Sequence, residues 1–304
     1  MELAAGIVLS DLHMGERVFP SQVYGRNAVD HHVLAARLQH VTESALRLLP
    51  AADEVHLCLN GDLVAGIRHL ESIETNDLTP MEQLQQVTFH VGEAVTKVAI
   101  WCSENGRVPL FIHCLPGNHG DLTHHHQCKN SFGNNIDWQS YHQMQQNLRR
   151  LNAELGIEVE WDIPDSLFTQ FDMAGYTVHM MHGHSPGRRG APARADGPRG
   201  PAWPGIRLAE RTRRQMDSLG LPFDIFIHGH MHWAYSEQIT VWDRYAREFR
   251  RLAVIGNGSI VGYNEYAMAL GFEYQPPVQM VFTVEPGLGV TTAQPIYCSL
   301  EGVS

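Results

Sequence analysis

Short apolar segments, each followed at once by Asp, Asn, Gly or His, dominate the pattern of this 304-residue chain. Continuous apolar runs of about four to eight residues are typical of strands buried on both faces. The sequence predicts such strands at 6–10, 55–59, 109–115, 176–181 and 223–227. Ligands of open α/β sheets bind at the carboxyl ends of the strands, so we expect the polar clusters after these strands to converge.

Apolar residues at helical spacing mark two long segments between these strands. Residues 27–49 carry them up to Pro50 and predict one helix. A second helix is predicted from Thr79 to about Glu104, because Thr79-Pro80-Met81-Glu82 supplies a cap, a first-turn proline and a capping-box glutamate. The helical period disappears after residue 232, and the glycine-rich turns that follow predict further strands at 237–241, 252–255, 279–284 and 289–295.

A segment rich in Gly, Pro, Ala and Arg interrupts this order at 185–204. No packed core selects such a composition, so we expect a long loop. The predicted strands on either side both end in candidate ligands, which indicates one domain over residues 1–304 with this loop as an insertion. Arg188 and Arg189 are candidate substrate contacts, because the planar guanidinium group matches phosphate oxygens.

Composition narrows the classes of protein to consider. No apolar stretch approaches the roughly 20 residues that span a bilayer, and the N-terminus offers no signal peptide. We therefore expect a cytoplasmic protein without a membrane partner. The five cysteines include no C-x-x-C pair, which disfavours a disulfide framework.

The charge is unevenly distributed. A formal net charge of -11 disfavours nonspecific binding to duplex nucleic acid. Twelve arginines nevertheless lie between residues 188 and 251, whereas the whole chain has two lysines. A phosphate-facing arginine patch on an acidic protein is compatible with this distribution.

The polar clusters combine carboxylate, imidazole and amide oxygen, which are ligands of hard-to-borderline divalent metals. In chain order the clusters are Asp11-Leu12-His13, Gly61-Asp62, Gly117-Asn118-His119, His182-Gly183-His184 and Gly229-His230-Met231-His232. Two ions about 3.5–4 Å apart need a bridging carboxylate and further ligands on each side. One cluster alone would be a common turn, but five in series, each after a strand, are specific.

The order of these clusters resembles the signature of the calcineurin-like metallophosphoesterase superfamily. The resemblance implies an α/β fold, namely a four-layer αββα sandwich with two mixed β-sheets. It also implies two divalent metal ions, with manganese expected and iron or zinc compatible. The implied metal ligands are Asp11, His13 and His232 for the first ion, Asn118, His182 and His230 for the second, and Asp62 as the bridge.

The resemblance also implies roles around the ions. His119 is expected to lie just outside them and to donate a proton to the leaving group, while His184 faces the substrate. Many relatives carry an acidic residue directly after G-N-H, where this chain has Gly120 and then Asp121, so Asp121 is predicted to orient His119. Ala65 stands where relatives often have a second aspartate.

A further likeness lies after the last cluster. The segment 256–259, Gly-Asn-Gly-Ser, together with 263–266, resembles a branch of the superfamily that is common in phage and prophage genomes.

The leading hypothesis is a two-metal phosphoester hydrolase, leaning toward a phosphodiesterase or nuclease that acts on nucleotides or on single-stranded nucleic-acid ends. A phosphomonoesterase acting on nucleotides or proteins is the first alternative. A non-catalytic binding module that kept the fold is the second, although all seven ligand positions and His119 are intact. An amidohydrolase would show an early H-x-H and a late Asp, the reverse of this chain. The sequence specifies no oligomeric state.

Overall fold

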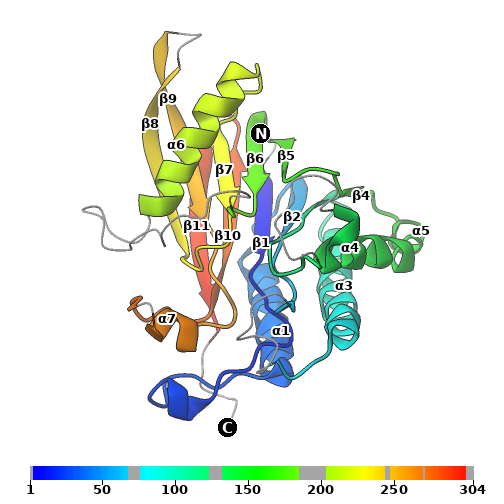
Figure 1. Cartoon of the computed structure of the whole chain (residues 1–304). Coiled ribbons are helices and arrows are strands. Elements are labelled where there is room, and N and C mark those ends of the chain that lie inside the picture. Colours follow the sequence, from blue (N-terminus) through cyan, green and yellow to red (C-terminus); the bar gives the residue numbers. More distant parts are fainter. Residues whose placement is uncertain are drawn as a thin grey trace.

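Two β-sheets lie face to face, with helices on both outer faces (Figure 1). The computed structural model describes residues 3–67, 76–122, 132–184, 203–243, 247–269 and 271–298. The helices are α1 (His31–Leu48), α3 (Pro80–Glu104), α4 (Ile136–Asn147), α5 (Leu151–Leu155), α6 (Trp203–Ser218) and α7 (Glu265–Ala269), with short 3-10 turns η1 (Pro20–Gln22) and η2 (Phe132–Asn134). The strands are β1 (Ala4–Leu9), β2 (Glu54–Asn60), β3 (Leu110–Leu115), β4 (Val159–Asp162), β5 (Phe168–Met173), β6 (Tyr176–Met181), β7 (Ile225–His228), β8 (Tyr235–Asp243), β9 (Glu248–Gly256), β10 (Val278–Glu285) and β11 (Gly289–Tyr297).

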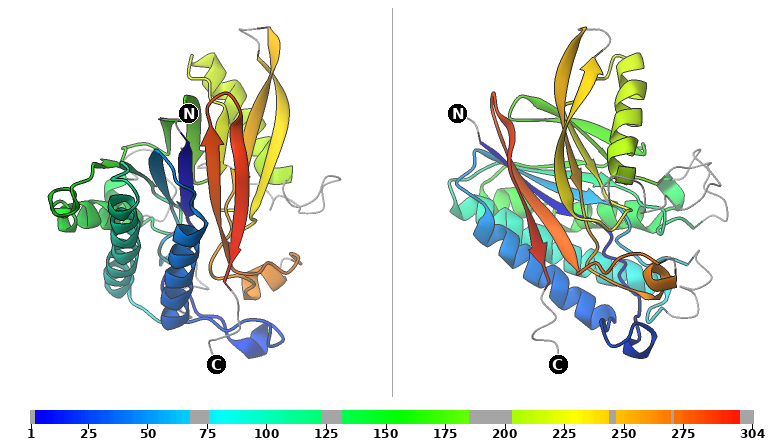
Figure 2. Two further views of the ribbon diagram at one scale, coloured as in Figure 1. Left: turned by 180° about the vertical axis from the view of Figure 1, so that it is seen from behind. Right: turned by 90° about the vertical axis from the view of Figure 1, so that its left-hand side faces the viewer.

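Both sheets are mixed, which confirms the predicted fold class. The first sheet has the order β11-β10-β1-β2-β3-β4, in which β1 to β4 are parallel and β10 runs antiparallel to β1. The second sheet has the order β5-β6-β7-β9-β8, with parallel pairs β6–β7 and β7–β9 between antiparallel edges. Strands β1 and β10, from opposite ends of the chain, lie side by side (Figures 1 and 2).

Three apolar layers hold the sandwich together. Val8 and Phe282 of the first sheet pack with Val178 and Ile227 of the second in the layer between the sheets. Helices α1, α3, α4 and α5 bury their apolar faces on the outer side of the first sheet. Helix α6 covers the outer side of the second sheet (Figure 2). The inner strands β1, β2, β7 and β10 are buried on both faces, which explains their continuous apolar sequences.

Local chemistry sets where the two long helices begin. The capping box at Thr79 is present, and α3 spans Pro80–Glu104 as predicted. Helix α1 begins at His31, four residues later than expected, because the Asp30 side chain accepts a hydrogen bond from the Val33 amide and caps the helix there. Helix α6 begins at Trp203, inside the predicted loop 185–204, since proline is tolerated in a first turn.

Several elements had no clear pattern in the sequence. Helix α4 buries Asp137 and Ser140 beside Ile136, Tyr141 and Met144, so its inward face is partly polar and its apolar period is weak. The short elements β4, β5, α5 and α7 were likewise not predicted. No helix among the described residues is long and apolar enough to cross a membrane.

Candidate metal centre

The predicted ligands converge because they all follow the carboxyl ends of strands from the two sheets. Among the described residues, three groups of Asp and His side chains have ligand atoms that lie within 4.8 Å of one another inside each group. These groups are Asp11, His13 and His232; His13, Asp62 and His119; and Asp62, His182 and His230. His13 and Asp62 each belong to two groups, so the three form one continuous cluster.

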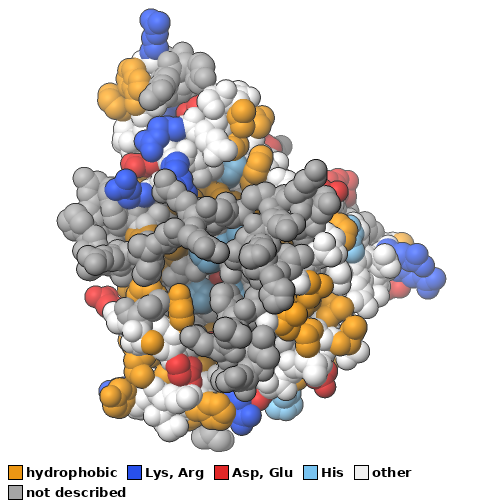
Figure 3. Space-filling view, in the orientation of Figure 1, with side chains coloured by type: hydrophobic (Ala, Val, Ile, Leu, Met, Phe, Trp, Pro, Cys, Tyr) orange, Lys and Arg blue, Asp and Glu red, His pale blue; other side chains and the backbone are white. Residues whose placement is uncertain are grey.

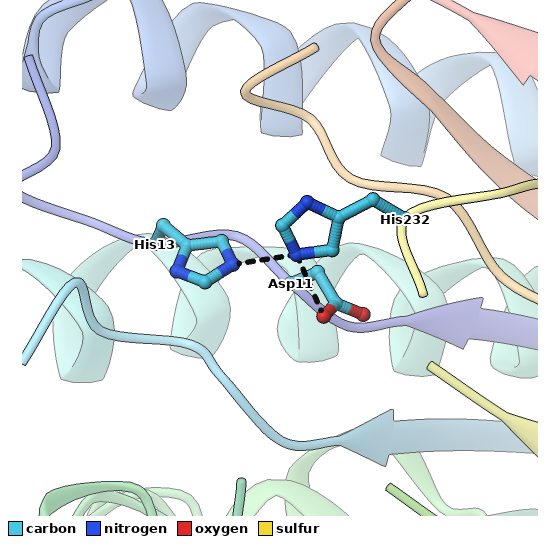
Figure 4. Close-up of side chains that lie close together, drawn as sticks. All are labelled: Asp11, His13 and His232. Carbon is cyan, nitrogen blue, oxygen red and sulfur yellow. Dashed lines mark hydrogen bonds and ion pairs between the residues drawn. The ribbon is translucent and has the colours of Figure 1, made fainter. Parts of the chain in front are cut away.

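The first group joins the end of β1 to the segment after β7 (Figure 4). Nε2 of His13 lies 3.1 Å from Nε2 of His232, and the latter atom lies 3.3 Å from Oδ1 of Asp11. Asp11 and His13 are fully buried. One carboxylate oxygen and two imidazole nitrogens therefore point at a common volume, as three ligands of one ion would.

Asp62 is the link to the second group. Its Oδ2 lies 2.9 Å from Nε2 of His182, while its Oδ1 accepts a hydrogen bond of 2.7 Å from the His119 backbone amide. His230 completes this group. A carboxylate shared between two sets of histidines is the arrangement that a bridging ligand requires.

Several nitrogen and oxygen atoms of the cluster are placed to share a cation, either a proton or a metal ion. Nδ1 of His182 lies 2.7 Å from the Asn60 carbonyl and donates to it, so Nε2, which faces the Asp62 carboxylate, is the nitrogen that can carry a proton or bind a metal ion. A lone pair and a carboxylate oxygen at that distance repel unless a proton or a metal ion lies between them. The buried Oδ1 of Asn118 also accepts no hydrogen bond from the described part of the chain, as suits a metal-ligating amide.

The pKa values of the clustered histidines are shifted in two directions. Burial, with His119 and His232 close by, lowers the pKa of His13 well below its usual value, and burial also lowers the pKa of His230. Both are neutral imidazoles, the form that binds metal. Burial alone would lower the pKa of His182, but the Asp62 carboxylate raises it to about 10. A proton on Nε2 of His182 therefore competes with a metal ion for this position.

The backbone at the ligands is strained. Among the described residues nine non-glycine residues have positive φ, and five of them are predicted ligands. The five are Asp11 (φ 54°), His13 (φ 46°), Asp62 (φ 51°), His230 (φ 64°) and His232 (φ 55°). Left-handed backbone in non-glycine residues costs about 1–3 kcal/mol each and concentrates at functional sites. The surrounding fold holds these turns in place to aim the side chains.

Glycine is required beside the carboxylates. A Cβ at Gly117 would lie 2.1 Å from Oδ1 of Asp62, and one at Gly229 would lie 2.5 Å from Oδ2 of Asp11. Any side chain at these positions would displace a ligand.

His119 lies at the edge of the cluster. Its Nδ1 lies 2.8 Å from the Ala65 carbonyl, and its ring contacts that of His13 edge-on, with centroids 4.4 Å apart. His119 also offers one ring nitrogen to the group that it forms with His13 and Asp62. Asp121 is buried and accepts a 3.0 Å hydrogen bond from Asn135. The Ala65 carbonyl therefore orients the His119 ring, and a further role for Asp121 in this remains a prediction.

The other candidate substrate contacts have different outcomes. His184 lies next to the second group, with its ring centroid 5.4 Å from that of His182 and 6.3 Å from that of His230. Arg188 and Arg189, with most of the predicted loop 185–204, lie outside the described residues.

Asp137 on α4 was not predicted, yet it fixes two of the ligand turns. It is fully buried, and its oxygens accept hydrogen bonds from the Leu63 amide (3.2 Å) and the Gly117 amide (3.0 Å). Burial, with the Asp62 carboxylate nearby, raises the pKa of Asp137 to about 7. One side chain thus joins the turn that carries Asp62 to the turn that carries Asn118.

The segment after β9 supports Asp11 from behind. Oγ of Ser259 donates to the Asp11 carbonyl at 2.7 Å. The Asn257 amide donates to Oγ of Ser10 at 2.8 Å, and that hydroxyl donates to Oδ2 of Asp11 at 2.5 Å. The Gly-Asn-Gly-Ser motif therefore positions a ligand rather than supplying one.

Fold and site together define an αββα sandwich protein with a buried cluster of carboxylate and imidazole groups that could hold divalent metal ions. No family model matches the chain, and no curated protein matches it.

Among solved structures the chain is similar to an archaeal phosphodiesterase (11% identity, TM-score 0.39, covering 97% of this chain and 99% of that one). It is also similar to a dimetal phosphatase from Danio rerio (10%, 0.37, 97% and 99%) and to a predicted phosphoesterase from Streptococcus pneumoniae (10%, 0.35, 98% and 99%). Likenesses this distant do not define an activity.

Proposed function

We propose that the protein is a two-metal hydrolase of phosphate esters. The observation that carries this proposal is the Asp62 carboxylate, which lies within 4.8 Å of ligand atoms on both sides, His13 on one and His182 and His230 on the other. Two divalent ions held there would supply activation of water and neutralisation of the phosphoryl oxygens. Manganese suits the mixed carboxylate, imidazole and amide donor set.

The chain's own residues supply positioning and proton transfer. Asp11, His13 and His232 would hold one ion, and Asn118, His182 and His230 the other. His119 lies in one group with His13 and Asp62 and its ring is fixed through Nδ1, so it can give a proton to a leaving oxygen. His184 lies beside the second group, where it can contact the ester's substituent.

We further infer that phosphodiesters of nucleotides or nucleic acids are hydrolysed in preference to monoesters. Twelve arginines lie between residues 188 and 251, and their guanidinium groups suit the additional phosphates of a nucleotide or nucleic acid. A simple monoester offers no further phosphate for them to contact.

The test is a substrate panel. Protein loaded with Mn²⁺ is assayed against p-nitrophenyl phosphate, bis(p-nitrophenyl) phosphate, a cyclic nucleotide and an oligonucleotide, with EDTA-treated protein as the control. We expect the diester to be hydrolysed faster than the monoester. Absence of metal-dependent turnover on all four would contradict the proposed function, and a preference for the monoester would contradict the diester assignment.

A further inference from the structure

A row of three arginines runs along the exposed face of α6. Arg207, Arg211 and Arg214 are exposed and follow one another at intervals of four and three residues, which places them on one side of the helix. By its place beside Arg214 in the sequence, Arg213 could be taken for another exposed arginine. It is instead buried, and its Nε donates to Asp217 at 2.6 Å, so the exposed row has three members.

Helix α6 starts beside segments that carry predicted ligands and leads away from them. A Cβ at Gly205 would lie 2.4 Å from Nε2 of His228, two residues before the ligand His230. Cδ2 of Leu208 lies 3.7 Å from the Cβ position of Gly183, within the 182–184 cluster. The first turns of α6 therefore pack against the ligand segments. Figures 1 and 2 show the helix running from there along the second sheet toward the β8–β9 hairpin.

The row is a local concentration of positive charge on an acidic chain with net charge -11. Within α6 the acidic residues are Glu210 and Asp217, and Asp217 is already paired with Arg213. The nearby end of β9 adds the exposed Arg251, and Arg250, which pairs with Glu248. Figure 3 shows Lys and Arg side chains gathered over α6 and this hairpin, on a face where His side chains are also visible.

We propose that this row, Arg207, Arg211 and Arg214, is a track for the backbone of a single-stranded nucleic acid whose scissile phosphodiester lies in the metal centre. The inference rests on the proposed function and names its substrate class. The row spans about 10 Å at 1.5 Å per residue. Each of its three guanidinium groups can contact one backbone phosphate, so the row would face up to three phosphates. A row one residue wide matches one strand, and a small ester held at the metals does not reach it.

A membrane surface fits the row less well. Peripheral helices insert an apolar face into the lipid headgroup region. The apolar face of α6, with Leu208, Ala209 and Met216, is buried against the second sheet. Its exposed side chains, among those described, are arginines, Gln215 and Ser218.

Binding is measured without metal, so that it does not depend on turnover. A fluorescein-labelled single-stranded 20-mer is titrated with protein in EDTA at several salt concentrations, and anisotropy gives Kd. Loss of three phosphate contacts in R207Q/R211Q/R214Q should lower the slope of log K against log salt by about 2 and weaken binding at least about tenfold at 0.1 M salt. The single variant R211Q should lower the slope by about 0.7.

The matched control changes three arginines that are exposed elsewhere. R26Q/R149Q/R150Q removes the same net charge, and its slope should stay at the wild-type value. Equal loss of slope in both triple variants, or no loss in the α6 variant, would overturn the proposal. So would binding of wild-type protein to phosphatidylserine vesicles, but not to the 20-mer, with the vesicle binding lost in the α6 variant.

Turnover separates this inference from the proposed function. With Mn²⁺, the α6 variant should lower the ratio of kcat/KM for the 20-mer to kcat/KM for bis(p-nitrophenyl) phosphate by about tenfold or more. If the variant hydrolyses both substrates and the ratio is unchanged, the arginine track is wrong and the proposed hydrolase function stands. Failure to hydrolyse any ester would overturn the proposed function, while the EDTA binding experiment would still decide the track.

Discussion

Asp62 is the residue on which both halves of the centre depend, because it is shared by two of the three ligand groups. Asp62→Asn keeps the shape of the side chain but removes the negative charge between two cations. We expect the variant to lose ions from both positions and to have no measurable turnover. Metal content by mass spectrometry, measured beside activity, tests this. Two ions per chain in the purified variant would show that Asp62 is not a bridge.

His119 should behave differently, because its contacts place it beside the ligands with Nδ1 bound to the Ala65 carbonyl. We expect His119→Ala to keep the wild-type metal content while kcat falls by about 10²–10⁴, the range for loss of a proton donor. The same metal analysis distinguishes the roles. If His119→Ala lost ions as Asp62→Asn does, His119 would be a ligand.

Asp137 makes no contact with the centre through a ligand atom, yet it accepts hydrogen bonds from the turns of Asp62 and Asn118. In Asp137→Asn one oxygen becomes an N–H₂ group that faces a backbone N–H. We expect metal affinity to fall about 10- to 100-fold, as for other groups that orient ligands. Titration with Mn²⁺ measures it, with exposed Asp165→Asn as the control. Equal affinities in both variants would contradict the positioning role.

At the scale of elements, β6 carries a buried histidine that couples stability to pH. His179 packs among Phe168, Phe223 and Phe226, and burial lowers its pKa to about 4. Its folded pKa lies below the unfolded value of 6.5, so the unfolded chain binds the proton more readily. The stabilisation is complete above about pH 6.5 and is lost as pH falls toward 4.

We therefore expect protonation of His179 in the unfolded chain to lower the free energy of unfolding, measured in EDTA, by up to about 3 kcal/mol between pH 7 and pH 4. His179→Gln cannot titrate, so its stability should depend less steeply on pH over that interval. Urea unfolding at several pH values gives both curves. Parallel curves for the two proteins would show that His179 contributes no pH dependence.

At the scale of the whole molecule, the metal centre joins the two sheets. Its ligands follow β1, β2 and β3 of the first sheet and β6 and β7 of the second. Bound ions should therefore stabilise the sandwich, by about 2.7 kcal/mol when free metal is at 100 times Kd. Thermal unfolding with Mn²⁺ and with EDTA measures the shift in Tm. Asp62→Asn should show a smaller shift, and an equal one would place the stabilising ions elsewhere.

The sequence by itself determined the order of the elements and the residue types at the strand ends. A buried parallel strand must be apolar, and the turn after it must carry the chemistry, so the positions of Asp11, Asp62 and His182 could be inferred locally. The start of α1 at His31 was missed by four residues because Asp30 caps the helix within a continuous apolar period.

Only the tertiary structure decided which groups share a volume and which support them. Asp137, Ser259 and the Ala65 carbonyl act through hydrogen bonds to residues 20 or more positions away in sequence, and no local pattern marks such partners. Arg213 and Arg214 look alike in sequence, yet one is buried beside Asp217 and the other is exposed. The spacing of apolar residues in the sequence predicts an element and the polarity of its faces. Which of its side chains are buried or paired depends on the elements that pack against it.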